Sequence, residues 1–532
     1  MSDTAEKTVV ISRAVILWSL TIMALMVIVA GGMAVYVLSD PGIDDAITLR
    51  RAALTLANNY KGDLDTDELI SRGRAAMFEQ LDRYSSYVPR RQMLQRQEEL
   101  SGGYYGIGVI VVSHDRGLLI MSVRENGPAA EAGVLPGDII IEADTISLTG
   151  MTVSEASTLL RGPEGTQVEV GLFREAINDT THVSIERRRI ELLHLPFAGY
   201  TADSVLYMRL FDFQAGASDD IEAALDSLLT DTSQPRGIIL DLRGNPGGLM
   251  SEAFEIANLF LEENAFIVGT DSRSRWNEYA YHARGDALAS HLPMAILVDR
   301  GSASAAEIVA GALRYNDRAI LVGDTTFGKG LVQGFWEFPG GDGLRLTISR
   351  YYFEGNVFLN DYDTTLTQTG RGLPPDYHVE PDYGGRFGRE LDNSLLLQRF
   401  VSIHLDSLVA AWKSGTLDTS WIERLAVYAR TEGFTFQSPT TEATELFGAL
   451  AQLETTSNDL LGLSEQLTSR AEVLDSRLWL THAEYIFSRM ERLLVERHLG
   501  MYEAYRTVIV PRREDIRLAT KLLLQQQPAD QT

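Results

Sequence analysis

Residues 237–261, GIILDLRGNPGGLMSEAFEIANLFL, carry the pattern that decides the fold of the largest part of this chain. The branched apolar run Gly237–Leu242 is typical of a buried strand. The strand pattern ends in a glycine-rich turn, and an amphipathic helix pattern follows directly. A buried strand that leads into a helix is the unit of a parallel sheet, so this stretch predicts an α/β domain.

The same alternation repeats on both sides of this stretch, from Ser204 to about Tyr383. Further strands are expected at SVLYMRL (204–210), MAILVD (294–299), AILVGD (319–324) and LVQGFWEF (331–338), and helices at SDDIEAALDSLL (218–229) and near Ser304. We therefore expect an α/β core over residues 190–388.

Two different textures precede this core. Residues 43–100 place apolar side chains at helical spacing and are expected to be helical. Residues 101–189 are rich in glycine and β-branched residues, with strand patterns at 102–112, 117–123 and 167–173 and a helix pattern at TVSEASTLL (152–160). This second segment predicts a compact, β-barrel-like module.

Beyond residue 388 the strand patterns cease, and amphipathic helices are expected over 389–525, followed by a disordered tail at 526–532. Leucines recur here at partly helical spacing, at Leu446, Leu450, Leu453, Leu474, Leu478 and Leu480. They suit a helical bundle with its own core, or a surface for homo-oligomerisation or for docking of an adaptor.

The N-terminus carries an uncharged apolar run, Ala14–Leu38, that is long enough to cross a bilayer as a helix. Lys7 and Arg13 precede it, so residues 1–13 are expected to form a cytoplasmic tail and the rest to lie on the periplasmic or extracytoplasmic side of the cell (inner) membrane. A cleaved secretory signal is the alternative, and it also exports the main body.

Composition excludes several classes of function. The 532 residues include 47 basic and 73 acidic side chains, a formal net charge of −26, which disfavours a nucleic-acid partner. The chain has no cysteine, and this excludes a disulfide framework, a thiol nucleophile and thiolate-bound zinc.

One candidate for chemistry is Ser304, in DRGSASAAEIVAGAL (299–313). A serine at a helix N-terminus exposes its hydroxyl, and the amide of the following residue can stabilise an oxyanion. The spacing of Ser304 and Glu307 also fits a capping box, which would only close the helix end.

A second candidate is Lys329, in TTFGKGLVQ (325–333). A buried lysine loses charge because desolvation disfavours the ammonium, and it can then act as a general base. Gly323–Lys329 also spells most of a phosphate-binding loop, but Gly330 replaces the required Ser or Thr and a strand pattern follows in place of a helix.

The third candidate is the glycine-rich turn in LDLRGNPGG (240–248). Glycines after a buried strand let backbone amides face a cleft, as an oxyanion hole requires. A plain tight turn is the structural alternative.

Together these three segments resemble the carboxyl-terminal processing (tail-specific) protease family, over about residues 43–383. The resemblance implies Ser304 as nucleophile and Lys329 as base, with Gln333 orienting the lysine. It places the oxyanion amides on Ala305 and Gly248. The chain departs from many members of the family at Ala306, where they have serine, and this position is neither nucleophile nor base.

The module at 101–189 resembles a PDZ domain. In such domains the amides of a loop hold the terminal carboxylate of a peptide, which adds as a strand beside a groove helix. The residues that match this loop are Tyr105, Gly106, Ile107 and Gly108. A plain β-turn is the alternative at these residues, but VRENGPAAEAGVLPGDIII and LLRGPEGT favour the PDZ interpretation.

The resemblance implies a serine endopeptidase that cleaves exported proteins bound by their C-terminal tails, through an acyl-enzyme and without cofactor or metal. A Ser-His-Asp triad is not expected, because His282, His291 and His378 lie in no recognisable motif and GxSxG is absent. The alternative is a binding protein, either a PDZ scaffold or a ligand-binding relative of the same α/β fold.

Overall fold

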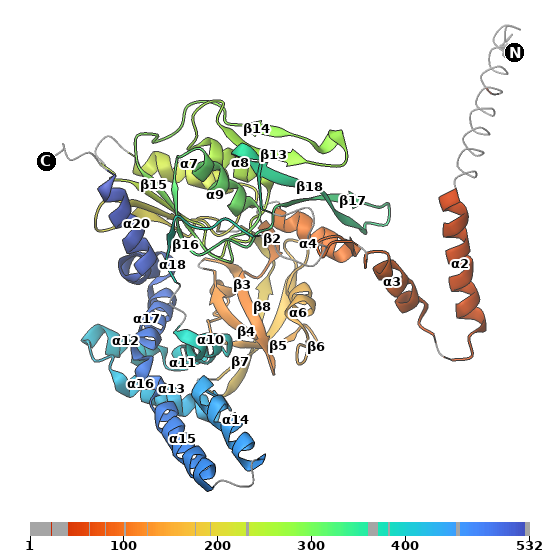
Figure 1. The fold of residues 1–532 in the computed structure, drawn as a ribbon. Coiled ribbons are helices and arrows are strands. Elements are labelled where there is room, and N and C mark those ends of the chain that lie inside the picture. Colours follow the sequence, from red (N-terminus) through yellow and green to blue (C-terminus); the bar gives the residue numbers. More distant parts are fainter. Residues whose placement is uncertain are drawn as a thin grey trace, which may run out of the picture. The chain divides into compact units, whose positions relative to one another are not determined.

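The computed structural model describes residues 23, 41–62, 64–79, 81–100, 103–124, 126–175, 177–191, 193–229, 234–359, 371–380, 384–453 and 458–526. Two compact units are present, residues 1–87 and 88–532 (Figure 1).

The first unit contains α2 (Pro41–Asn59) and α3 (Thr66–Ala76), as the apolar spacing predicts. Arg74 stacks on the ring of Tyr87, 4.4 Å from its centre, and donates to its hydroxyl. The predicted membrane helix Ala14–Leu38 lies outside the described residues. Across the described ranges, no helix combines the length and the apolar character that crossing a bilayer requires. Strand β1 (Ser86–Val88) falls across the boundary between the units, and here the helical prediction for residues 43–100 is wrong.

The second unit opens with α4 (Arg90–Leu100) and continues into the predicted β-rich module. Its sheet has the strand order β3-β4-β5-β7-β8, with β6 paired to β5. The elements are β3 (Val109–His114), β4 (Gly117–Val123), α5 (Pro128–Glu131), β5 (Ile139–Ala143), β6 (Ile146–Ser147), α6 (Val153–Leu160), β7 (Gln167–Arg174) and β8 (Asp179–Glu186).

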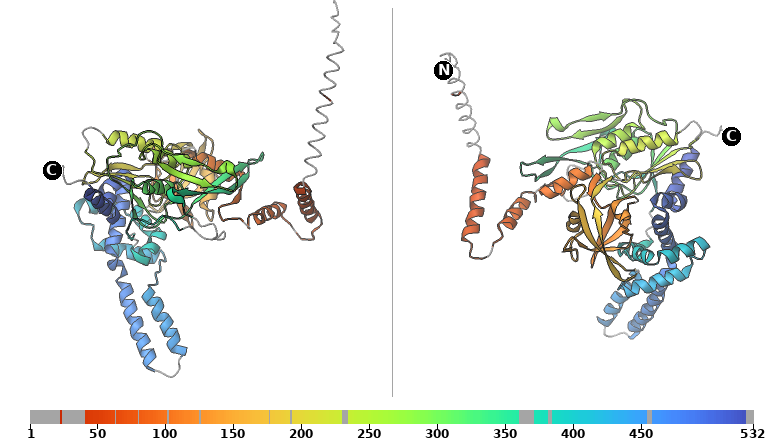
Figure 2. Two further views of the ribbon diagram at one scale, coloured as in Figure 1. Left: turned by 45° about the horizontal axis from the view of Figure 1, so that its top comes forward. Right: turned by 180° about the vertical axis from the view of Figure 1, so that it is seen from behind.

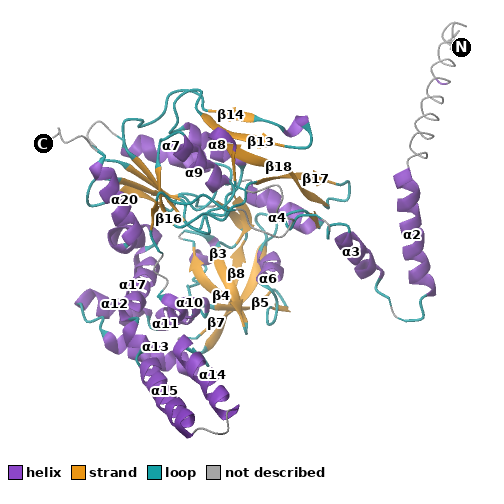
Figure 3. Ribbon diagram, viewed as in Figure 1, coloured by secondary structure: helices purple, strands orange, loops and turns teal. Residues whose placement is uncertain are grey.

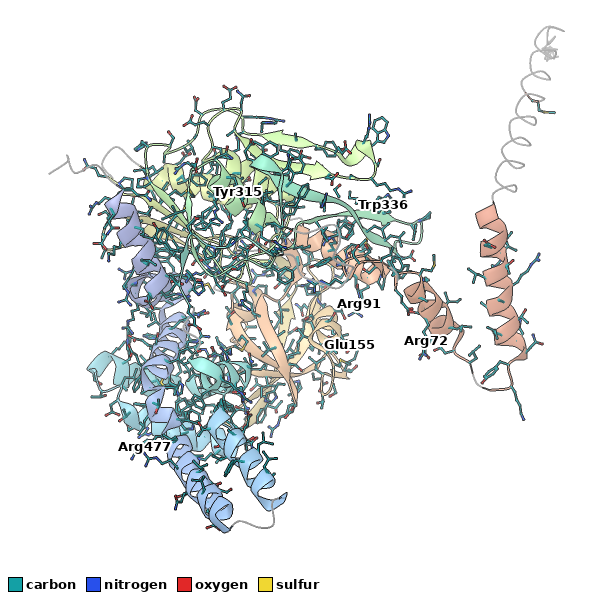
Figure 4. The ribbon with its side chains drawn as sticks, viewed as in Figure 1. Arg72, Arg91, Glu155, Tyr315, Trp336 and Arg477 are labelled. Carbon is teal, nitrogen blue, oxygen red and sulfur yellow. The ribbon has the colours of Figure 1, made fainter. Side chains whose placement is uncertain are left out.

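Helix α6 begins where a capping box predicts it should. The Glu155 amide donates to the Thr152 hydroxyl, and the Glu155 carboxylate accepts from the Thr152 amide (Figure 4 labels Glu155). Ala156 and Leu160 of this helix are buried against strand residues such as Leu118 and Val168. The module therefore has a core of its own.

A short ribbon frames the module. Strand β2 (Gly103–Gly106) pairs antiparallel with β9 (Arg188–Glu191), so Gly103 lies opposite Glu191. The chain enters and leaves the module at one place.

The core after the ribbon is a six-stranded sheet of order β10-β11-β12-β15-β16-β20, parallel except for the β10–β11 pair. The strands are β10 (Phe197–Tyr200), β11 (Leu206–Arg209), β12 (Ile238–Asp241), β15 (Met294–Val298), β16 (Ile320–Gly323) and β20 (Tyr377–His378). Helices α7 (Ala217–Leu228), α8 (Met250–Asn258) and α9 (Ala305–Tyr315) connect them. The alternating strand and helix patterns thus predicted the α/β core correctly.

The central sheet is buried on both faces, as its continuous apolar strands indicate. Ile238 and Leu240 of β12 face the core formed with α7, α8 and α9. Ile239, between them, faces a second core that contains Ile516 and Leu523 of α20 (Glu514–Gln525). One layer of this domain therefore comes from the end of the chain (Figure 3).

A second sheet joins β13 (Phe266–Asp271), β14 (Ala280–His282) and the long β18 (Gly343–Phe353), with β17 (Leu331–Glu337) and β19 (Val357–Phe358) also paired to β18. Single-turn segments η1 (Arg275–Asn277) and η2 (Glu354–Asn356) lie in its connections. The strand predicted at 331–338 is present, which rules out the helix that a phosphate-binding loop needs.

The C-terminal region is helical (Figure 2). Its elements are α10 (Gly385–Asn393), α11 (Leu396–Ile403), α12 (Leu405–Ser414), α13 (Thr419–Thr431), α14 (Pro439–Leu453), α15 (Asn458–Ser476), α16 (Leu478–Thr481), α17 (Ala483–Leu499), α18 (Met501–Ala504), η3 (Tyr505–Ile509), α19 (Val510–Arg512) and α20. Helices α10–α13 and α17 share a core around Phe400 and Leu425. The region therefore divides between this core and the central sheet.

Candidate active site

The three candidate segments follow three neighbouring parallel strands. The glycine-rich turn follows β12, Ser304 follows β15 and Lys329 follows β16. The carboxyl ends of parallel strands lie at one edge of a sheet, where α/β proteins commonly place their sites. This topology brings together the residues that the sequence predicts to work together.

Ser304 is the N-cap residue of α9 and has a backbone conformation of φ 57°, ψ −114°. A positive φ is uncommon for a residue with a side chain and persists only where the surroundings hold it in place. The strain therefore falls on the predicted nucleophile itself.

Glu307 holds this strained turn. Its side chain is fully buried, and Oε2 accepts from the Ser304 amide (2.9 Å) and from the Lys329 amide (2.8 Å). Oε1 accepts from the Thr326 hydroxyl and the Gly328 amide, both at 2.6 Å. Burial raises the pKa of Glu307, and these four donors oppose that rise. One carboxylate thus joins the backbones of the predicted nucleophile and base.

Tyr351 of β18 makes a second connection between them. Its hydroxyl lies 2.5 Å from the Lys329 carbonyl oxygen, to which it donates, and 3.3 Å from that of Ser304. The ring is buried, so the hydroxyl position is fixed.

The electrostatic surroundings of Lys329 suit a base. Burial lowers the pKa of Lys329, the charges of Arg345 and Arg96 lower it further, and Glu307 raises it. Arg96 of α4 is itself placed over the ring of Phe335, 3.8 Å from its centre. Local desolvation and like charges thus favour the neutral amine.

Gln333 lies in β17 opposite Thr347, at a bulge that follows Val332. Its side-chain nitrogen is buried, with no hydrogen-bond partner among the described residues. No hydrogen bond is described between Gln333 and Lys329, so its orienting role stays a prediction.

The predicted oxyanion amides belong to Ala305 and Gly248. Among the hydrogen bonds of the described residues, none uses the amide of Ala305 or of Gly248 as donor. Gly247 adopts φ +94°, and a Cβ atom there would lie 2.9 Å from the Ala305 nitrogen. Any side chain at residue 247 would therefore crowd the amide that the oxyanion needs.

The glycine-rich turn is tied to the segment that carries Ser304. The buried Asn245 accepts the Ala303 amide at its carbonyl oxygen (2.9 Å), and its side-chain oxygen accepts the Gly247 amide (2.9 Å). The Ser302 hydroxyl donates to the Leu242 carbonyl oxygen (2.8 Å). The two segments are therefore held in register on either side of the predicted oxyanion site.

A buried charged group anchors the start of this turn. Arg243 donates from Nε to Asp241 Oδ1 (2.8 Å), and Arg209 donates to the same oxygen (3.1 Å). The Tyr207 hydroxyl donates to Asp241 Oδ2 (2.5 Å). Burial acts to raise the pKa of Asp241, but Arg209 and Arg243 outweigh it and hold that pKa well below its usual value.

The module at 101–189 carries a small groove between β3 and α6. A cavity of about 60 Å³ is lined by Tyr104, Gly106, Ile107, Gly108, Val109, Val111, Ser157, Leu160 and Arg161. In the described part of the chain, the amides of Ile107 and Gly108 donate to no other group. Tyr105 lies in β2 opposite Arg189, and its carbonyl oxygen accepts the Gly162 amide (3.4 Å). The predicted loop thus brings glycines and unpaired amides to one end of a groove, as carboxylate binding requires.

Sequence reasoning missed several residues of this centre. Glu307 was considered only as a helix cap, although its spacing from Ser304 gave the signal. Tyr351, Arg345 and Asp241 carried no local signal, because each acts across a strand pair or a turn.

Comparison with known proteins identifies the family of the chain. Residues 204–379 match the model of peptidase family S41, and residues 119–174 match a PDZ domain. The carboxy-terminal processing protease CtpA of Bacillus subtilis is 32% identical over 337 residues, which cover 63% of this chain and 69% of that protein. The carboxy-terminal-processing protease of Bartonella bacilliformis is 31% identical over 318 residues, which cover 59% of this chain and 70% of that protein.

Among solved structures, the photosystem II D1 C-terminal processing protease aligns with 63% of this chain and 87% of its own, at 24% identity and a TM-score of 0.38. The assignment rests on the two sequence relatives, both above 30% identity over more than two thirds of their length. On these matches the chain belongs to the carboxy-terminal processing proteases of peptidase family S41 and is a serine-type protease with a PDZ domain.

Proposed function

We propose that Ser304 and Lys329 form the catalytic dyad. The observation that carries this proposal is the Glu307 carboxylate, which accepts a hydrogen bond from the backbone of each. Neutral Lys329 takes the Ser304 proton as Oγ attacks the peptide carbonyl carbon, and the amides of Gly248 and Ala305 stabilise the oxyanion. Collapse releases the amine, which takes the proton from Lys329, and water then hydrolyses the acyl-enzyme.

Covalent labelling tests the dyad. A fluorophosphonate reagent is expected to add one adduct to the wild-type chain, and peptide mapping is expected to place it on Ser304. Ser304→Ala should take up no label, whereas Ser251→Ala, at an exposed serine of α8, should label as wild type does. Labelling that persists in folded Ser304→Ala would contradict the assignment.

Substrates, in this proposal, are exported proteins bound by their C-terminal tails. The terminal carboxylate meets the amides of Ile107 and Gly108, and the last apolar side chain enters the groove beside α6. Binding at this second site raises the concentration of the chain near Ser304.

The proposal also keeps Ala14–Leu38 as a membrane anchor, with the catalytic part on the periplasmic or extracytoplasmic side. Its support is the uncharged apolar sequence of that segment alone. The full chain should sediment with membranes and resist extraction at high salt, and a chain lacking residues 1–40 should not. Salt extraction of the full chain would contradict an anchor.

A docking role for the C-terminal helices stays a prediction. Leu446 and Leu450 of α14 are 65% and 54% exposed, which suits a contact surface for a second copy or an adaptor. Light scattering of the wild type and of Leu446→Ser tests the homo-oligomer, and equal masses would contradict it.

A further inference from the structure

Asp515 is a buried carboxylate at the start of the last helix, α20. It is 5% exposed, and it accepts a hydrogen bond from Arg243, which lies 272 residues earlier in the glycine-rich turn. On its solvent side Arg513 donates to both carboxylate oxygens, at 2.8 and 3.2 Å. Burial acts to raise the pKa of Asp515, but Arg243 and Arg513 outweigh it and lower that pKa below its usual value.

The contact between Asp515 and Arg243 balances the charge of a buried group. Two guanidinium groups, Arg209 and Arg243, share the single carboxylate of Asp241. Asp515 supplies the second negative charge, so the buried group of four is neutral. Without it, one positive charge of the group would lack a counter-charge in the interior, which is strongly unfavourable.

The packing of α20 holds Asp515 next to Arg243. Ile516, Ala519 and Leu523 of α20 are buried against the central sheet. Their sheet partners include Ile239 of β12, the strand that leads into Arg243. The carboxylate is thus delivered by a helix that covers the strand before the turn.

The turn in question carries the oxyanion amide. From Arg243 it runs to Gly248, and Asn245 and Leu242 tie it to Ala303 and Ser302. A displacement of Arg243 would therefore move the Gly248 amide relative to Ser304.

We propose that Asp515 is a positioning residue for the oxyanion site, supplied to the glycine-rich turn by the C-terminal helix. The proposal rests on the Ser304–Lys329 dyad, and it assigns to the far end of the chain a part in catalysis. Asp515 touches no reacting atom, and it acts through Arg243.

The test compares Asp515→Asn, which keeps the shape and removes the charge, with Glu514→Gln. Glu514 is the exposed neighbour in the same first turn, so both variants remove one charge from the same helix end. kcat and KM are measured on a short peptide, at a temperature well below the melting temperature of each variant. Each kcat is divided by the concentration of active sites, which is found by titration to completion with the fluorophosphonate. We expect Asp515→Asn to lower kcat by about tenfold, less than the loss of an oxyanion donor itself. KM and Glu514→Gln should stay near wild type.

The pH profile separates positioning from general loosening. Because Glu307 and not Asp515 holds Lys329, the pH midpoint of kcat should not move in Asp515→Asn. Arg513→Gln removes only the solvent-side partner of Asp515 and should lower kcat by about threefold. If Asp515→Asn does not fold, this variant tests the proposal in its place.

A kcat for Asp515→Asn within about twofold of wild type, or an equal loss in Glu514→Gln, would overturn the proposal. A moved pH midpoint would overturn it as well. Absence of hydrolysis and labelling in the wild-type chain would instead refute the dyad, so the two failures are distinguishable.

Discussion

The proposed catalytic centre and the groove of the PDZ domain differ in whether their hydrogen-bonding groups are already paired. In the proposed catalytic centre a buried carboxylate, Glu307, accepts four hydrogen bonds from four residues, one of which is Ser304. At the groove, small residues leave the amides of Ile107 and Gly108 open to an incoming group.

The difference shows which of the two sites must hold its hydrogen-bond donors in place before the ligand arrives. Chemistry needs donors that are already in place, since reorganising them during the reaction raises the barrier. Tail binding needs only a shape and two amides, because the peptide completes the strand pairing itself. Substitutions should therefore act on kcat in the first region and on tail dependence in the second.

The largest effect is expected at Lys329. Lys329→Arg should lower kcat by about 10⁴-fold or more, because arginine stays charged and cannot accept the serine proton. Steady-state hydrolysis of a peptide by folded protein measures it. Lys413→Arg, the same change at an exposed site in α12, should leave kcat unchanged. Turnover by Lys329→Arg near the control rate would remove Lys329 from the mechanism.

Glu307→Gln tests the bridge between nucleophile and base. An amide offers one acceptor oxygen where two are used, so two of the four donors lose their partner, at about 1–3 kcal/mol each. kcat should fall about 100-fold, and the melting temperature should drop.

The matched control is Glu155→Gln, at the equivalent position of the capping box of α6. That box is exposed, and glutamine serves there almost as well as glutamate. Equal kcat values in the two variants would reduce Glu307 to an ordinary helix cap.

Tail recognition sharpens the comparison from the other side. Amidating the C-terminus of an apolar-tailed substrate should slow cleavage by about tenfold, on the order of 1.4 kcal/mol. Gly106→Val should mimic this loss, because a Cβ there would lie 2.9 Å from the Tyr104 ring that lines the groove. Cleavage of a short, unanchored peptide is the control and should be less affected. Equal rates on free-acid and amidated tails would assign the groove another role.

The smallest effect is a shift in pH dependence. The proposed mechanism requires the neutral amine of Lys329, so the rate should rise with pH through a pKa that burial, Arg345 and Arg96 lower. Arg345→Gln removes a charge that repels the ammonium, so the pKa should rise and the midpoint of kcat should move to higher pH. Arg300→Gln, at a side chain that is 84% exposed, should leave the midpoint in place. A midpoint that moves to lower pH in Arg345→Gln would contradict the role of Lys329.

Local pattern was enough to predict much of this molecule. Strands β12, β15 and β16 are nearly continuous apolar runs, and these runs predicted the α/β core. The three candidate segments were joined through the resemblance to a family. The helix pattern at residues 152–160 likewise predicted α6.

Other elements had no local signature. Strand β8 is mostly exposed, and only Val183 and Ile185 of its sequence DTTHVSIE reach the core, so it was missed. The β17–β18 hairpin brings Tyr351 and Arg345 to Lys329 through pairing across strands, which spacing along the chain does not show. The contact between Arg243 and Asp515 spans 272 residues and depends on the packing of α20.

The β2–β9 ribbon bears on how the PDZ module joins the rest of the chain. Gly103 and Glu191 lie opposite each other, so the whole PDZ module departs from and returns to one point of the host. A guest inserted between neighbouring ends leaves the host core intact, and this is the arrangement in which insertion of a domain is tolerated. Each part can then accept mutations without disturbing the other's core. The ribbon is thus the junction at which the PDZ module and the α/β core can change independently of each other.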